Sequence, residues 1–172
     1  AAQRVYFVAK SEVAAWAGIG WLARATGTLF ITRIPAHAKR QQLEFEARLR
    51  AGQRLLFFPE GTSTDGSVVL PFKPTLFAAL YAPDMGQMHV QPASLIYRAP
   101  KGCAHNFYGW YGDMDFAPHL LQVLAAPSRG HVTLMLHPAL RVADYPSRKD
   151  LAAACEQIVR AGFQIGQLDK RR

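Results

Sequence analysis

The amino-acid sequence predicts an α/β layered domain with a largely parallel mixed sheet flanked by helices, and three observations lead to this fold class. Runs rich in β-branched and aromatic residues alternate with helical segments through the first part of the chain. Strands separated by helices need crossover connections, which favour parallel pairing. The chain has 172 residues, of which 50% are hydrophobic and 19% charged, so it can bury a core. We expect residues 1–172 to form one domain.

The first half of the chain supplies the alternation. "VYFVA", residues 5–9, has the β-branched and aromatic content of a strand. The mostly apolar residues 11–27 follow, and we expect a buried helix or helix pair that Ser11 caps and Gly27 ends. "TLFITR", residues 28–33, is the second predicted strand.

A polar helix leads to the third predicted strand. Residues 38–52 are amphipathic, and Gly52 is placed to end this helix. Residues 55–59 form an apolar block that we expect to be a buried strand, and Glu60 stands directly at its end. The order strand, helix, strand, helix, strand therefore predicts the parallel sheet.

The second half has weaker signals. Pro74 is well placed to start a helix through "TLFAALYA". Residues 88–97 are predicted to form a strand despite Pro92, and a long loop is expected around residues 103–116.

A further strand and the clearest helix end the chain. "HVTLML", residues 131–136, is the predicted strand. Ser147 and Asp150 form a capping-box pattern at the start of the last helix, and Gly162 is expected to stop it. Its apolar face comprises Leu151, Ala154, Cys155, Ile158 and Val159.

Charge and cysteine content narrow the classes of function. The formal net charge of +8 suits nucleic acid, phosphorylated metabolites or an anionic membrane surface, but the basic residues are scattered. The two cysteines, Cys103 and Cys155, have no C-x-x-C pairing, which argues against a disulfide framework and a cysteine metal site. No apolar run approaches the ~20 residues of a membrane span. The chain lacks an initiating methionine, so we expect upstream sequence to have been removed.

"FFPEGTSTDG" places a carboxylate at the end of an apolar strand. Ligands bind at this edge in open α/β sheets, so Glu60 is a candidate binding residue. An equally good interpretation is that the Glu60 carboxylate caps the turn of the following loop. The side chains of Thr62, Ser63 and Asp65 could also provide such a cap. Local chemistry leaves both interpretations open.

Three cations stand at comparable ends of elements. Arg33 ends the second predicted strand and would share an edge with Glu60 if the second and third strands are neighbours. Lys10 and Lys73 repeat the pattern. Convergence of all three would form a phosphate or carboxylate pocket, whereas a lone arginine at a strand end more often faces solvent.

Other chemistry-bearing residues have structural interpretations. Asp113 and Asp115 are more often caps than ligands of a divalent cation, and residues 106–112 are better explained as a packed aromatic loop than as a base-stacking surface. No nucleophile elbow is present, so the histidines are expected to be structural or exposed. They are His37, His89, His105, His119, His131 and His137.

Four blocks together resemble the glycerolipid acyltransferase family typified by 1-acylglycerol-3-phosphate acyltransferase: "VYFVAKSEV", "GTLFITR", "FFPEGTSTDG" with "LPFK", and "VQPASLIY". The resemblance implies transfer of a fatty acyl group from acyl-CoA or acyl carrier protein to the hydroxyl of a lysolipid. It also implies an acceptor site whose residues here are Arg33, Pro59, Glu60, Gly61 and Thr62, with Ser63 and Lys73 beside them.

The chain departs from the family at the catalytic base. Members carry an H-x-x-x-x-D block shortly before the "FVAK" strand, and its histidine is the general base. The residues five places after the histidines here are Gln42, Ser94, Trp110, Leu124, Leu136 and Val142, so the block is absent. We expect the catalytic histidine and aspartate upstream of Ala1, and this chain alone to be inactive. Attack of a hydroxyl on a thioester requires no metal or redox cofactor.

The acceptor is less defined than the reaction. Members that use glycerol phosphates typically read F-P-E-G-T-R, and Ser63 takes the place of that arginine here. The loss of a cation suits a head group with one carboxylate, so a lyso-ornithine lipid and lysophosphatidic acid stay close to even. We expect the protein at the cytoplasmic face of the inner membrane, on an anionic surface and without nucleic acid. The alternatives are a non-catalytic basic α/β module that binds anionic membrane or nucleic acid, and a pseudoenzyme.

Overall fold

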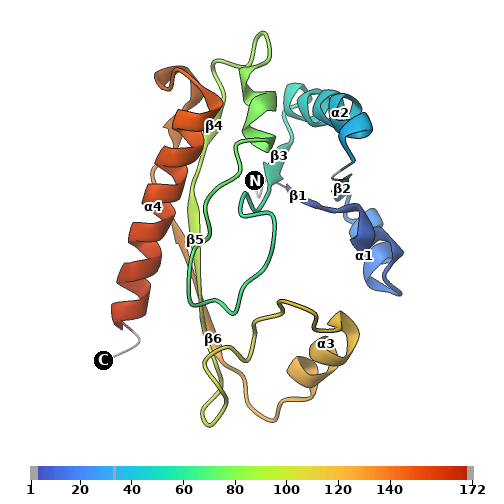
Figure 1. Ribbon diagram of the computed structural model, residues 1–172, viewed down its shortest axis with the longest axis vertical. Coiled ribbons are helices and arrows are strands. Elements are labelled where there is room, and N and C mark those ends of the chain that lie inside the picture. Colours follow the sequence, from blue (N-terminus) through green and yellow to red (C-terminus); the bar gives the residue numbers. More distant parts are fainter. Residues whose placement is uncertain (1–3, 33, 170–172) are drawn as a thin grey trace.

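The computed structural model describes residues 4–32 and 34–169 (Figure 1). The elements, in order, are β1 (Val5–Lys10), η1 (Ser11–Ala15), α1 (Ile19–Ala25), β2 (Leu29–Ile31), η2 (Pro35–His37), α2 (Ala38–Arg50), β3 (Arg54–Leu56), η3 (Leu76–Tyr81), β4 (His89–Val90), β5 (Ala93–Arg98), α3 (Phe116–Ala125), β6 (His131–Leu136), β7 (Leu140–Arg141), η4 (Val142–Asp144) and α4 (Arg148–Asp169). Elements labelled η are 3-10 helices.

The first three strands form the predicted parallel sheet. Their order is β2-β1-β3, with Val8 opposite Leu29 on one side and Phe7 opposite Leu56 on the other. The α/β fold class is therefore confirmed. Strand β3 is shorter than the predicted residues 55–59, because it ends before Pro59, which has no N–H group for a strand ladder.

The later strands pair antiparallel in two separate ribbons, β4 with β7 and β5 with β6. The single strand predicted over residues 88–97 is divided into β4 and β5 at Gln91 and Pro92. The carbonyl of Pro92 accepts a hydrogen bond from the His137 N–H at 3.0 Å, which continues the pairing of β5 with β6 beyond Ala93 and Leu136.

Residues 11–27 form the predicted helix pair, but its environment differs from the prediction. Gly18, at φ +72°, separates η1 from α1. The pair is not buried, since the Trp21 side chain is 71% exposed. The Ser11 hydroxyl contacts the adjacent Glu12 carboxylate at 3.2 Å and does not cap the helix.

Helix α4 runs along β5 and continues past Gly162, where it was predicted to stop (Figure 1). A Cβ atom at Gly162 would lie 2.7 Å from Ser94 Oγ, and one at Gly166 would lie 2.5 Å from Ile96 Cγ1. These glycines permit close packing of the helix on the strand and do not terminate it. The predicted start is confirmed, because Ser147 Oγ accepts from the Asp150 N–H at 3.3 Å.

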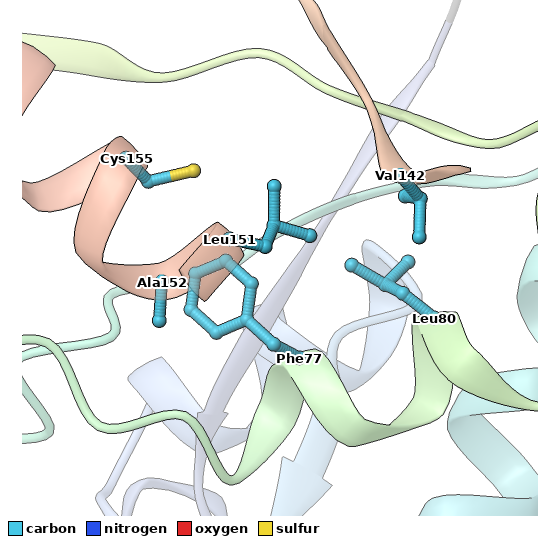
Figure 2. Close-up of a cluster of buried hydrophobic side chains, with 6 residues drawn as sticks. All are labelled: Phe77, Leu80, Val142, Leu151, Ala152 and Cys155. Atoms are coloured by element: carbon cyan, nitrogen blue, oxygen red, sulfur yellow. The ribbon is translucent and has the colours of Figure 1, made fainter. Parts of the chain in front are cut away.

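Two buried clusters join the sheet to α4. The first gathers side chains from η3, η4 and α4, and Figure 2 shows Phe77 and Leu80 facing Leu151 and Val142. The second contains Val8, Leu29, Phe45 and Ala79. Leu49 and Phe57 pack against both clusters, so the sheet, α2 and α4 share one continuous core.

Cys155 lies in the first cluster, where burial raises the pKa of its thiol to about 11, and both cysteines are free. Within the described residues, no helix combines the length and apolar character that a bilayer crossing requires.

Candidate functional site

The edge where the parallel strands end carries the candidate site. The three strands β2-β1-β3 are parallel, so their carboxyl ends meet at one edge of the sheet, where ligands bind in open α/β sheets. Glu60 follows β3 at this edge, and Lys10 ends β1 beside it. Gly61 turns the chain there at φ +69°, a conformation that favours glycine, and its N–H donates to the Phe58 carbonyl at 3.1 Å.

The Glu60 carboxylate closes the loop that follows it. Its Oε2 accepts a hydrogen bond from the Leu70 N–H at 2.7 Å. Burial raises the pKa of Glu60, and the Leu70 hydrogen bond partly offsets this effect. Among the described residues, Oε1 of Glu60 has no hydrogen-bond partner, so one oxygen fixes the loop and the other is available to a ligand.

Asp65 performs the local turn function that was the alternative interpretation of Glu60. Its Oδ1 accepts from the Ser67 N–H at 2.9 Å and from the Ser67 hydroxyl at 2.6 Å. These bonds span two residues, whereas the Glu60 bond to Leu70 spans ten. Glu60 therefore organises the whole loop and not a single turn.

Lys73 closes the same loop from its other end. Its N–H donates to the Pro59 carbonyl at 2.9 Å, and its side chain passes over Gly61, where a Cβ atom would lie 3.1 Å from Nζ. The structure thus brings the predicted residues 59–61 and Lys73 together. Thr62 and Ser63 are exposed on the same loop.

The predicted convergence of three cations on Glu60 depended on β2 and β3 being neighbours, and β1 lies between them. Arg33, the residue expected at the end of β2, lies outside the described residues. Across residues 4–32 and 34–169, Glu60 forms no ion pair within 4.0 Å.

Among the described residues, a cation whose charge acts on the Glu60 pKa comes from α4, a helix with no motif that points to the site. Arg160 lowers the Glu60 pKa, and Glu156 raises it to a smaller extent. Glu156 Oε2 accepts from the Phe72 N–H at 2.8 Å, and its Oε1 accepts from Arg160 Nε at 2.8 Å. The Phe72 hydrogen bond is the main reason that the Glu156 pKa lies below its usual value.

Two carboxylates therefore hold the loop, Glu60 from within and Glu156 from α4. The contact between Phe72 and Glu156 spans 84 residues of sequence. The Glu156 and Arg160 spacing of four residues on a helix was the available signal, but it is also the spacing of an ordinary surface ion pair.

A serine and a histidine also meet, at a second place. Ser94 Oγ lies 2.8 Å from His137 Nε2 and donates to the Val159 carbonyl at 3.0 Å. Because the hydroxyl has one proton, His137 Nε2 is the donor to Ser94. Ser94 is 1% exposed, so this pair fastens α4 to β5 and is not a nucleophile. The prediction of a structural histidine is confirmed for His137.

The carboxylates and aromatic residues that precede α3 were the remaining candidates. In the part of the chain that the structure describes, no three metal-binding side chains are grouped to hold an ion. The prediction of a capping side chain is wrong for Asp115, which precedes α3 without a side-chain capping bond. The predicted packed aromatic loop is confirmed. Trp110 lies 5.3 Å from both Trp16 and Phe116, and the rings of Trp16 and Phe116 stack at 4.3 Å.

Comparisons with known proteins agree on one family. Residues 1–96 match the profile of the Acyltransferase family. The lyso-ornithine lipid O-acyltransferase of Rhodobacter capsulatus is 58% identical over 164 residues, which cover 95% of this chain and 59% of that protein. The enzyme of the same name from Brucella abortus is 34% identical over 177 residues, covering 97% of this chain and 66% of that protein. The chain thus spans about three fifths of the first relative's length.

The fold has a counterpart among solved structures. The crystal structure of the 1-acyl-sn-glycerophosphate (LPA) acyltransferase from Thermotoga maritima superimposes with a TM-score of 0.62 at 23% identity, covering 94% of this chain and 56% of that one. The solved structure shows that the fold is shared, and the family match over residues 1–96 shows that this chain belongs to the acyltransferase family.

Proposed function

We propose that the chain is the acceptor-binding part of an O-acyltransferase that acylates a lysolipid. The observation that carries the proposal is the loop that Glu60 and Lys73 close beyond the parallel strands, within an intact F-P-E-G-T sequence. Membership of the acyltransferase family supports the reaction type. The names of the relatives support a lysolipid as acceptor.

The reaction joins the acceptor hydroxyl oxygen to the carbonyl carbon of an acyl thioester and releases the thiol of acyl-CoA or acyl carrier protein. A base must take the hydroxyl proton, and oriented dipoles must stabilise the oxyanion. In this scheme Pro59 and Gly61 shape the turn, while Glu60, Thr62 and Lys73 present polar groups to the acceptor. Arg33 is proposed as a further binding residue from the family motif.

The base belongs, in this proposal, to residues outside the chain. The family's H-x-x-x-x-D block does not occur in the 172 residues, and the Rhodobacter relative is longer than the part that the chain matches. We expect acyl transfer by the polypeptide that contains the block, called here the full-length protein. The chain alone should be slower by about 10²- to 10⁴-fold, the usual effect of losing a general base.

A lyso-ornithine lipid is the acceptor that the observations favour. The Rhodobacter capsulatus and Brucella abortus relatives bear that name, and Ser63 stands where glycerol-phosphate enzymes have an arginine. Lysophosphatidic acid is the second candidate, because a protein named 1-acyl-sn-glycerol-3-phosphate acyltransferase from Neisseria meningitidis is 37% identical over 76 residues.

We place the enzyme at the cytoplasmic face of the inner membrane, where a soluble acyl donor and a lysolipid meet. Helices α1 and α3 expose large apolar side chains, which supports an anionic membrane surface as partner. Trp16, which follows η1 and precedes α1, stacks on Phe116 of α3. The net charge of +8 adds attraction to anionic lipid. The exposed side chains are Trp21, Leu22, Leu121 and Leu124.

The test offers each lysolipid to the full-length protein with acyl-CoA or acyl carrier protein, and mass spectrometry quantifies the product. We expect acylated ornithine lipid, and we expect Ser63→Arg to raise the use of lysophosphatidic acid about tenfold. Gln87→Arg adds the same charge at another exposed position and should change neither rate. Acylation of neither lysolipid would contradict the proposal and favour a non-catalytic module.

A further inference from the structure

A groove lies between α4 and the loop that Glu60 and Lys73 close, next to the site described above. It has a volume of about 530 Å³, and it is lined by residues 67–69 of the loop and by one stripe of the helix. Residue 69 directly precedes Leu70, whose N–H binds Glu60. The stripe comprises Arg160, Phe163, Gln164, Gln167 and Leu168.

The helical spacing sets these side chains apart from the core face of α4. Residues 160, 164, 167 and 168 follow the helical period of about 3.6 residues, so they share one face of α4. Gly162 and Gly166 face β5, where they pack on Ser94 and Ile96. The helix therefore uses one face for the core and a separate face for the groove.

Arg160 is the charged residue of the groove. One hydrogen bond orients its guanidinium and does not use the terminal nitrogens. Nε donates to Glu156 Oε1 at 2.8 Å, and the side chain is 38% exposed. In residues 4–32 and 34–169, neither terminal nitrogen of this guanidinium has a hydrogen-bond partner. A planar guanidinium with free terminal N–H groups is suited to bind a carboxylate or phosphate.

The surrounding charges favour one of these anions. Glu156 pairs with Arg160, and Glu60 binds the N–H of Leu70, the residue that follows the groove-lining Val69. Two carboxylates beside one guanidinium would repel a doubly charged phosphate. They would accept a ligand that carries one carboxylate and one ammonium group.

We propose that this groove binds the head group of an amino-acid lysolipid, with the terminal nitrogens of Arg160 on its carboxylate and its ammonium group on the side of Glu60. The inference rests on the proposed function, whose acceptor it specifies. Phe163 and Leu168 from the helix and Val68 and Val69 from the loop cover the hydrocarbon parts of the ligand. Arg160 is thus a specificity-determining residue contributed by α4, outside the residues 1–96 that match the family profile.

The test measures kcat and KM of the full-length protein with a lyso-ornithine lipid and with lysophosphatidic acid, for Arg160→Ala and Arg160→Lys. We expect Arg160→Ala to raise KM for the lyso-ornithine lipid about ten- to hundredfold, with kcat changed less than threefold, which corresponds to loss of a charge-assisted hydrogen bond. Arg160→Lys should fall between that variant and the unmodified protein, since it keeps the charge but not the planar fork. The KM for lysophosphatidic acid should not rise.

The matched control is Arg141→Ala. Arg141 also pairs with a carboxylate on its own segment, Asp144 at 2.7 Å, and its side chain is 49% exposed, but it lies on β7 and not in the groove. It should leave both KM values unchanged. Gln164→Glu is a second variant, because a carboxylate four residues from Arg160 would compete for its terminal nitrogens, and it should also raise KM for the lyso-ornithine lipid.

Two results would overturn the inference: an unchanged KM in both Arg160→Ala and Gln164→Glu, or an equal rise for both lysolipids. A failure of the proposed function is separate, because the unmodified full-length protein would then acylate neither lysolipid.

Discussion

The parallel sheet with its loop and the antiparallel ribbon with α4 divide the work of the molecule differently. The first region carries the family sequence, within residues 1–96, and presents Glu60 and Lys73 at the strand ends. The second region, from β5 to α4, has fewer recognisable motifs, yet Glu156 holds the loop and Arg160 lines the groove beside it. The difference teaches that the family match lies in the first region, while a helix far along the chain holds the loop and, in our proposal, selects the head group.

The largest expected effect comes from breaking the core that joins the two regions. Leu151 lies on α4, packs against η3 and is 0% exposed. Leu151→Ala should therefore lower the free energy of unfolding by about 2–5 kcal/mol. Urea denaturation measures this. Leu121→Ala, at a side chain that is 66% exposed, is the control and should change it by less than about 0.5 kcal/mol. Equal effects of the two variants would mean that α4 is not part of the shared core.

Gly162→Ala tests how closely α4 must approach β5. The new Cβ would lie 2.5 Å from the His137 ring and 2.7 Å from Ser94 Oγ, so the helix must move away from the strand. We expect a loss of about 1–3 kcal/mol of stability by thermal denaturation. Gly86→Ala is the matched control, since no atom lies within 4 Å of its added Cβ, and it should be neutral. A neutral Gly162→Ala would contradict the close packing.

Much of the first region could be predicted because its signals are local. Strand content at β1, the amphipathic α2 with its Gly52 stop, and the carboxylate after β3 each depend on a few neighbouring residues. The same local reasoning identified β6 with its observed bounds, residues 131–136.

The errors arose where distant contacts override local signals. Gly162 was expected to end the helix because glycine often follows the last turn. The helix continues instead, because β5 packs closely against this glycine. Pro92 interrupts a run of strand-forming residues, and the division sends β4 and β5 to different partners. The bond between Phe72 and Glu156 could not be predicted, since no local pattern relates residues 84 positions apart.

The pH dependence of stability should distinguish the two carboxylates that hold the loop, Glu60 and Glu156. We expect this effect to be smaller than those of Leu151→Ala and Gly162→Ala. The folded-state pKa of Glu156 lies below the ordinary value of 4.5, so its stabilisation is present above that value and is lost as the pH falls through the lowered pKa. The pKa of Glu60 is raised, so its contribution is present below 4.5 and is lost as the pH rises through the raised pKa.

The corresponding variants should therefore change the pH dependence of stability in opposite directions. Glu156→Gln should cost about 1–2 kcal/mol near pH 7 and make stability fall less steeply in acid. Glu60→Gln should remove the opposite slope just above pH 4.5. Urea denaturation between pH 3 and pH 7 measures both, and identical slopes in the two variants would show that the carboxylates are not in different environments.

The central claim is that Glu60 serves the acceptor and not only the loop. The most direct test measures both the acyl-transfer rate and the melting temperature of the full-length Glu60→Gln protein. Glutamine keeps an oxygen that can accept from the Leu70 N–H but removes the charge. We predict a loss of kcat/KM for the lysolipid of about ten- to hundredfold with a melting temperature close to that of the unmodified protein, and no loss for Glu44→Gln, an exposed position on α2. Undiminished transfer, or a loss that appears only where the protein unfolds, would contradict the account.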